Sequence, residues 1–276
     1  KPHRKSSVSA RAMHQLSLAR RQAVNRRSGV ISSLREVFEL YYPVASKIFD
    51  DLATPLALAF LKQWPDPLSL SKARESTLVN FFHQHRSRSE KAIAKRIELI
   101  RSAVCLLKDP LLLEVARMRV SDHVGQIQSL NKAIDGYEER IEKIFCEHEK
   151  MPLFSNLPGA AKKLAPRLLA AFCLIQPEDA SEMQTLVGIA PFRVQSGQST
   201  KTFMRQRCPK FLRQSFHEFA GCSVNSSLWA KAFYDYHTKI KKKNPHAAKR
   251  ALAFKWIRIL YACWKNDRPY SETEYI

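Results

Sequence analysis

The residues best suited to chemistry lie in one basic segment between residues 192 and 217. This segment contains no Asp or Glu and six cationic residues, namely Arg193, Lys201, Arg205, Arg207, Lys210 and Arg213. The stretch Gln195–Thr200 within it predicts a small, hydroxyl-rich turn. A serine on such a turn is suited to attack a phosphodiester, because the surrounding cations stabilise the charge that develops on the phosphate. Ser196 is therefore the candidate nucleophile, with Ser199 and Thr200 as rival hydroxyls.

A serine hydroxyl is a weak nucleophile until a base removes its proton. No His or Glu lies near Ser196 in the sequence, so a base or a metal would have to come from elsewhere. Most Ser-Gly pairs are simply turns. The residues alone therefore leave both a catalytic serine and an ordinary turn open at this position.

A second candidate element, Leu157-Pro158-Gly159, resembles the hairpin of a helix-hairpin-helix DNA-binding motif. Its glycine would allow a close backbone approach, and the helix that follows would present free N–H groups to a phosphate. Lys162 and Lys163 add positive charge. Ala161 stands where the motif usually has a second glycine, and Pro166 is expected to bend the helix. The alternative is an ordinary turn between helices.

A third basic element lies between residues 236 and 266, where no acidic residue occurs. A run of lysines there precedes a helix that carries further cations, and the candidate contacts are Lys241, Lys242, Lys243, Lys249 and Arg250. Such a run is usually a solvated face. Its single sign of charge favours a surface that contacts a nucleic-acid backbone.

The composition also points to a polyanionic partner. The chain has 46 Lys and Arg against 25 Asp and Glu, a formal net charge of +21. Such an excess is typical of nucleic-acid-binding proteins, with an anionic membrane surface as the alternative. The sequence predicts neither a transmembrane segment nor a signal peptide, and its six cysteines lack zinc-site spacing. These features predict a cytoplasmic, nucleoid-associated protein with no metal site of its own.

The hydrophobic pattern predicts a mainly α fold, in which long coiled-coil-like helices precede a mostly helical C-terminal domain with a short β hairpin. Only 7 glycines occur in 276 residues. A first helix is expected to end near Pro43, and a second helical region spans residues 53–107 with an interruption at 64–67. Ser69 or Ser71 is the expected cap of the helix that follows the interruption.

The clearest periodicity follows Pro110, where apolar residues recur at steps of four and three: Ala116, Val120, Val124, Ile127, Leu130, Ile134, Tyr137, Ile141 and Ile144. This seam is typical of a coiled coil and favours a homodimer or a higher homo-oligomer. The alternative is a long helix packed inside its own domain, for example against the first helix.

Two domains and a tail are expected. Residues 1–150 are a helical, coiled-coil dimerisation region, residues 151–267 are a C-terminal domain with the helix-hairpin-helix-like turn and the serine loop, and residues 268–276 are a loosely held tail. Residues 151–156 are predicted to form a hinge. Residues 192–203 predict two short strands or an irregular hairpin. Helices are expected near 182–187, 210–222, 227–239 and 245–264.

The order of several short motifs resembles the C-terminal domain of transposases of insertion-sequence family 110, which include RNA-guided bridge recombinases and Piv-type DNA invertases. The motifs are Leu157-Pro158-Gly159, Gly188-Ile189-Ala190-Pro191, Gln195-Ser196-Gly197, the stretch Arg207–Arg213 and the stretch Asn244–Ala251. The resemblance covers about residues 157–264. One departure is Arg207-Cys208-Pro209, where relatives often have Arg-Gly-Asn.

The resemblance implies a serine nucleophile, which maps to Ser196, a coiled-coil region and a RuvC-like domain with a four-carboxylate Mg²⁺ site. It also implies DNA and a structured guide RNA as partners. No RuvC-like pattern precedes Ser7, and the first residue is Lys1, so we expect a fragment that binds DNA but does not cut it. The alternative function is a non-catalytic helical nucleic-acid-binding protein.

Overall fold

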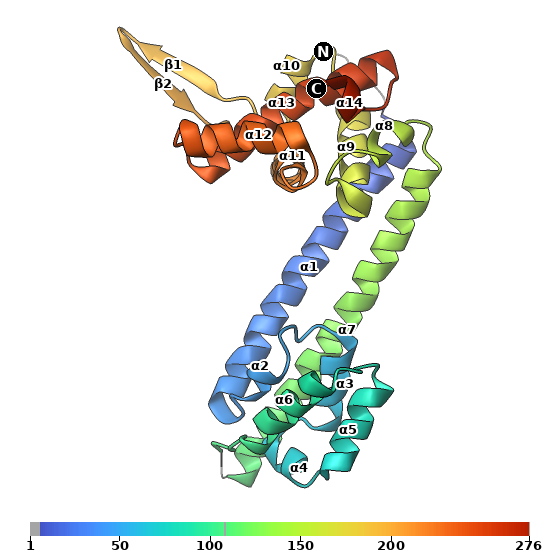
Figure 1. The fold of residues 1–276 in the computed structure, drawn as a ribbon, viewed down its shortest axis with the longest axis vertical. Coiled ribbons are helices and arrows are strands. Elements are labelled where there is room, and N and C mark those ends of the chain that lie inside the picture. The colour runs from blue at the N-terminus through green and yellow to red at the C-terminus, as the bar shows by residue number, and fades with distance from the viewer. Residues whose placement is uncertain (1–5, 108, 276) are drawn as a thin grey trace. The chain divides into compact units, whose positions relative to one another are not determined.

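The computed structural model describes residues 6–107 and 109–275, which are mainly helical with one two-stranded hairpin, as predicted. The chain divides into two compact units. The hairpin unit comprises residues 6–19 and 137–275, and the helical unit comprises residues 20–136 (Figure 1). Helices α1 (Val8–Tyr41) and α7 (Pro110–Cys146) contribute to both. The boundary expected at residue 150 lies inside the hairpin unit, because Ala10, Met13 and Phe145 pack in its core.

The helical unit contains the predicted interruption between two helical stretches. Helices α2 (Ala45–Ile48) and α3 (Pro55–Gln63) precede it, and α4 (Pro67–Ser71), α5 (Glu75–Gln84) and α6 (Glu90–Arg101) follow it. An aromatic cluster fills the core. The centroid of the Phe60 ring lies 5.9 Å from that of Phe81 and 6.1 Å from that of Phe82, on which it stacks. Leu34 and Phe38 of α1 complete this core.

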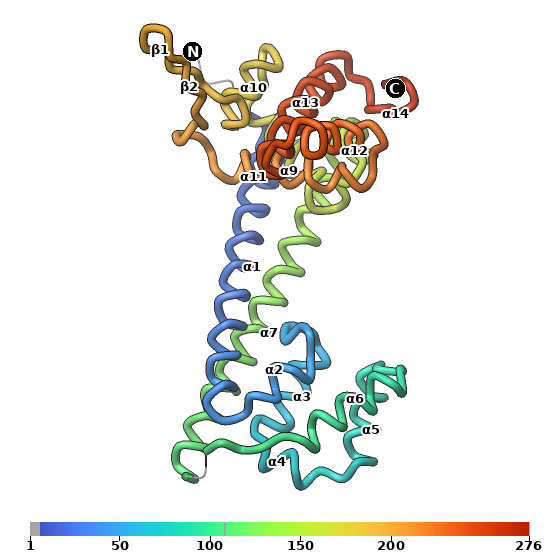
Figure 2. The backbone as a smooth tube through the Cα atoms, turned by 60° about the vertical axis from the view of Figure 1, so that its left-hand side comes forward, coloured from blue at the N-terminus to red at the C-terminus, as the bar shows by residue number. Residues whose placement is uncertain are grey.

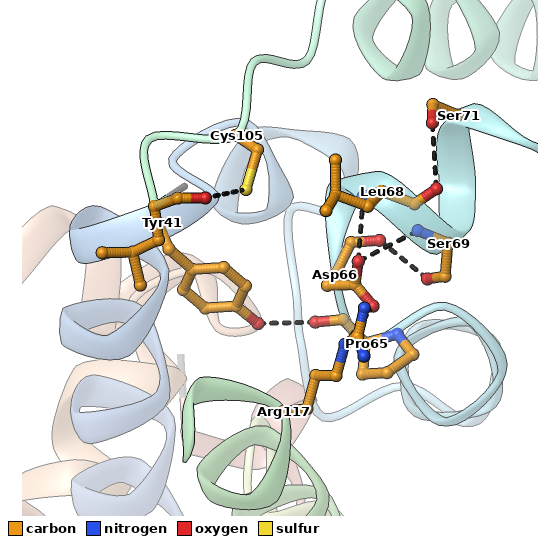
Figure 3. A network of polar contacts seen from close by, with 9 residues as sticks. Tyr41, Pro65, Asp66, Leu68, Ser69, Ser71, Cys105 and Arg117 are labelled. Atoms are coloured by element: carbon orange, nitrogen blue, oxygen red, sulfur yellow. Dashed lines mark hydrogen bonds and ion pairs between the residues drawn. The ribbon is translucent and has the colours of Figure 1, made fainter. Parts of the chain in front are cut away.

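Asp66 holds the interruption between α3 and α4 in place (Figure 3). Its carboxylate accepts hydrogen bonds from the backbone N–H groups of Leu68 and Ser69, both at 2.9 Å, and from Arg117 Nε at 2.8 Å. Burial alone would raise the pKa of Asp66, but the bonds from Arg117 and Ser69 outweigh it and lower the pKa. The predicted cap at Ser69 or Ser71 is wrong, because Asp66 caps α4 and both serines lie inside it.

The apolar seam of α7 is covered by the chain itself. Ala116, Val120, Val124 and Ile127 are buried in the core of the helical unit together with residues of α1. Ile134 and Ile141 are also buried. Of the two interpretations, the structure therefore supports a long helix packed inside its own chain, and the seam is not a free surface for a second subunit.

The hairpin unit is built around α9 (Ala161–Ile175), which is buried along most of its length. Helices α11 (Lys210–Ser223) and α13 (Pro245–Asn266) contribute Phe216, Phe219 and Trp256 to the same core. The other elements are α8 (Pro152–Ser155), α10 (Ala180–Leu186), β1 (Phe192–Ser196), β2 (Ser199–Phe203), α12 (Leu228–Asp235), the π-helical turn η1 (Tyr236–Ile240) and α14 (Glu272–Tyr275). The predicted helices and hairpin are confirmed.

Two segments of this unit differ from expectation. The predicted hinge at 151–156 forms α8, whose Leu153 and Phe154 are buried in the core. The predicted loose tail contains α14, and its Glu272 carboxylate accepts a hydrogen bond from the Leu228 N–H at 2.7 Å. Buried apolar side chains hold α8, and the hydrogen bond to Glu272 holds the tail. No helix in the described part of the chain is long and apolar enough to cross a membrane.

Candidate nucleic-acid interface

The hairpin that carries Ser196 is exposed along its whole length. All residues of β1 and β2 are solvent-exposed, and Figures 1 and 2 show the two strands projecting from the helices of their unit. Ser196 pairs with Ser199 at the end of the ladder. Gly197 follows with φ of +59°, a left-handed conformation that favours glycine and closes the tight turn. The sequence prediction of an exposed serine on a turn is confirmed.

The strand register shows on which face of the hairpin each of the rival hydroxyls, Ser199 and Thr200, lies. Residues paired across an antiparallel ladder share one face, and neighbours along a strand alternate between faces. Ser196 therefore shares a face with Ser199 and with Lys201, which pairs with Val194. Thr200 and Arg193 lie on the opposite face. Of the two hairpin cations, Lys201 is the one placed on the side of the candidate nucleophile.

No general base accompanies Ser196 in the described residues. The side-chain hydrogen bond at the turn is a long one, from the Gln195 amide to the Gly197 carbonyl at 3.4 Å. Among residues 6–107 and 109–275, no group of three or more His, Cys, Asp or Glu is arranged to hold a metal ion. The hairpin thus presents a hydroxyl and cations, and these residues do not supply the group that would remove its proton.

The segment after β2 brings further cations to the base of the hairpin. Arg207 and Lys210 are exposed, and Arg213 Nη1 donates a hydrogen bond to the Arg205 carbonyl at 2.9 Å. Arg250 of α13 lies close enough to Arg213 to be affected by its charge. Burial first, and then repulsion from Arg213, lower the pKa of Arg250. The structure therefore joins Arg205, Arg213 and Arg250 into one basic region.

The Pro-Gly turn has a packing role that the sequence does not show. Gly159 has φ of +77°, and a Cβ built on it would lie 2.7 Å from the backbone carbonyl carbon of Cys222. The backbone at Gly159 thus packs closely against α11 of the same chain. Ala161 adopts φ of +45°, the conformation that a glycine at this position of the motif would favour.

The two lysines after this turn are engaged with α7. Lys162 Nζ lies 2.7 Å from a Glu142 carboxylate oxygen, and Lys163 Nζ lies 3.4 Å from one of Glu138. Both lysine side chains are more than half exposed, so these are surface ion pairs of small energetic worth. A nucleic-acid phosphate that binds here has to compete with two carboxylates.

Replacing Gly159 by alanine is expected to lower the free energy of unfolding by about 3 kcal/mol, because a methyl group would overlap the α11 backbone at a left-handed φ. Urea unfolding measures the change. Gly197→Ala is the matched control, since that glycine also has positive φ but has open space around it. Its cost is expected to be about 1–2 kcal/mol, from the left-handed φ alone. Equal effects of the two substitutions would contradict the packing role.

The lysine run forms the turn between η1 and α13. Lys241, Lys242 and Lys243 are all exposed, and Lys242 has φ of +47°. The Lys243 N–H donates to the His237 carbonyl at 3.0 Å. Lys249 lies on the first turns of α13, with its aliphatic stem 3.7 Å from the Cβ position of Gly221. The predicted basic surface is therefore an exposed turn and the start of the helix that follows it.

Sequence reasoning missed a buried arginine in this unit. Arg167 of α9 is 8% exposed. Its Nε donates to Ser215 Oγ at 2.9 Å, and its Nη1 lies 2.8 Å from a Glu218 carboxylate oxygen. The guanidinium also lies over the Phe211 ring, 4.6 Å from the centroid. An arginine inside the otherwise apolar stretch of residues 164–175 was the available signal, and its role is to tie α9 to α11.

The Pro-Gly turn, the hairpin and the cations that follow it up to Arg213 all lie in one segment of the sequence. Residues 151–235 match the transposase IS116/IS110/IS902 family. The match covers Gly159, Ser196 and Arg213, and it ends before the lysine run of residues 241–243. The chain therefore contains a domain similar to those of this transposase family.

One relative extends the similarity along the chain. The insertion element IS116 uncharacterized 44.8 kDa protein of Streptomyces clavuligerus is 22% identical over 249 residues. The aligned part covers 88% of this chain and 60% of the relative. The chain thus spans less than two thirds of the length of this relative.

Proposed function

We propose that this chain is the DNA-handling portion of a transposase or recombinase that uses Ser196 as a nucleophile on DNA phosphates. The observation that supports this most is the position of Ser196 at the tip of a fully exposed hairpin, with Lys201 on the same face. The hairpin lies within the residues that match the transposase family. A projecting hairpin can reach a phosphodiester that a flat protein surface cannot.

In the proposed reaction, Ser196 Oγ attacks phosphorus and the bond from phosphorus to one deoxyribose oxygen breaks. The hydroxyl proton passes to a base, and the leaving oxygen takes up a proton. The phosphoserine bond conserves the energy of the broken ester, so the reverse attack by a DNA hydroxyl rejoins a strand. Lys201 is placed to stabilise the charge on the phosphate oxygens.

The base is assigned to no residue of this chain. The family resemblance implies Mg²⁺ bound by carboxylates of a RuvC-like domain, and the described residues do not form such a site. We propose that the group that removes the serine proton comes from outside the described residues. A structured guide RNA is the second proposed partner, with the basic region around Arg213 and Arg250 as its candidate contact.

We also propose a homodimer. Its interface is a surface of α7 other than the buried seam. Leu111, Val115 and Met118 follow one face of α7 at steps of four and three, and each is about half exposed or more. Such an apolar stripe is typical of a helix that packs on a partner. Sedimentation of the protein with and without Val115→Lys tests this surface.

The second candidate function is a non-catalytic nucleic-acid-binding protein. The observation that favours it is the lack of a general base beside Ser196 among the described residues. Both functions predict nucleic-acid binding. They differ in whether a covalent bond between serine and DNA forms.

DNA binding is expected to be strongly salt-dependent, with a change of about 0.9 in log affinity per tenfold change in salt for each phosphate contact. Removing two contacts with Arg193→Ala and Lys201→Ala should make the slope shallower by about 1.8. Fluorescence anisotropy with duplex DNA at several salt concentrations measures it. Lys91→Ala with Lys95→Ala, two exposed lysines of the helical unit, is the control that should leave the slope unchanged. A slope that is flat in the unmodified protein would contradict the proposed function.

A further inference from the structure

We propose that a groove between α13 and the C-terminal segment binds one unpaired nucleotide of a nucleic-acid strand. This inference rests on the proposed function, because it takes a nucleic acid as the partner. The groove encloses about 1040 Å³. Pockets that bind small molecules are usually about 300–1,000 Å³, so a nucleotide fits in the available space.

The groove carries an excess of positive charge. Its lining includes four cationic residues, Arg250, Lys255, Arg258 and Arg268, and one carboxylate, that of Glu274. Glu274 is paired with Arg268 at 2.8 Å. The remaining cations are suited to an anionic ligand such as a phosphate.

Aromatic rings stand beside these cations. Phe233, Phe254 and Tyr275 line the groove. Lys255 Nζ lies 5.2 Å from the Phe233 ring centroid and 5.6 Å from that of Tyr275. Aromatic rings stack on the faces of bases, and those faces are accessible only when a base has left its duplex. The combination of rings and cations therefore favours an unpaired nucleotide over a duplex.

The C-terminal wall of the groove is firmly held. The Glu272 carboxylate accepts hydrogen bonds from Ser227 Oγ at 3.0 Å and from the Leu228 N–H at 2.7 Å. Trp229 Nε1 donates to the Tyr270 hydroxyl oxygen at 2.6 Å. A wall fixed in this way reduces the entropy that binding would cost.

The groove also reaches the hairpin, because Thr202 of β2 contributes to its lining. Ser196 lies on the partner strand of the same hairpin. Thr202 pairs with Arg193, on the hairpin face opposite Ser196. A strand whose phosphate contacts Arg193 can thus place an unpaired nucleotide in the groove. This arrangement would select DNA or RNA that is locally open.

Binding of a 12-nucleotide single strand with a central 2-aminopurine, made as DNA and as RNA, tests the proposal. Arg258→Ala and, separately, Tyr275→Ala should weaken single-strand binding about tenfold, the loss of one phosphate contact or one stacking contact. Duplex DNA affinity should stay unchanged. Lys265→Ala is the matched control, an exposed cation on α13 outside the groove. Stacking in the groove should also quench the 2-aminopurine fluorescence, and Tyr275→Ala should remove part of this quenching.

Several results would overturn the proposal. An equal loss for single strand and duplex would mean that the groove is only part of a general basic surface. No loss in either variant would mean that the strand binds elsewhere. Adenosine monophosphate binding as tightly as the strand would identify a free nucleotide as the ligand instead. If the unmodified protein bound neither strand nor duplex, the proposed function itself would fail, which separates the two failures.

Discussion

Replacing Ser196 by alanine is expected to abolish the covalent protein–DNA adduct of the proposed reaction, in a protein that also supplies the proposed base. The substitution removes the attacking oxygen. DNA affinity should change by no more than about twofold, because a single exposed side chain away from the core contributes little to binding or folding. Denaturing gel electrophoresis with labelled DNA detects the adduct, and anisotropy measures the affinity. The described chain alone is expected to bind DNA without forming the adduct.

Ser199→Ala and Thr200→Ala are the matched controls for this experiment. Ser199 shares the face of Ser196, and Thr200 lies on the opposite face. Both variants should retain the adduct. An adduct that survives Ser196→Ala and disappears with Ser199→Ala would show that Ser199, on the partner strand, is the nucleophile. An adduct that forms in none of the proteins, including the unmodified one with the proposed base supplied, would favour the non-catalytic function.

Ile127→Lys is expected to lower the free energy of unfolding by about 4 kcal/mol, because it places a charged amine in a fully buried apolar site. The variant should therefore unfold at a lower urea concentration and not simply dissociate. Circular dichroism during urea unfolding, together with sedimentation, measures both properties.

Gln128→Lys is the control on the same helix, at an exposed position outside the apolar stripe of Leu111, Val115 and Met118. It should leave stability within about 0.5 kcal/mol of the unmodified protein. If Ile127→Lys instead left a stable, folded monomer in place of a dimer, the seam would be an interface between subunits and the packing seen in this structure would not be the one in solution.

The sequence by itself determined the local elements of this protein. Periodic apolar residues predicted α1 and α7, and the composition of residues 192–203 predicted the hairpin that presents Ser196. These features depend on neighbours a few residues apart, which a sequence displays directly. The basic segment and its candidate serine were visible for the same reason.

Only the tertiary structure decided what covers each element. Whether the Ile127 seam is free or buried depends on α1, about ninety residues earlier in the chain, which packs in the same core. The role of Gly159 depends on Cys222. The groove of Arg258 and Tyr275 arises from segments that meet only in the folded chain. Contacts between distant residues set burial and charge pairing, and local patterns do not encode which partners will meet.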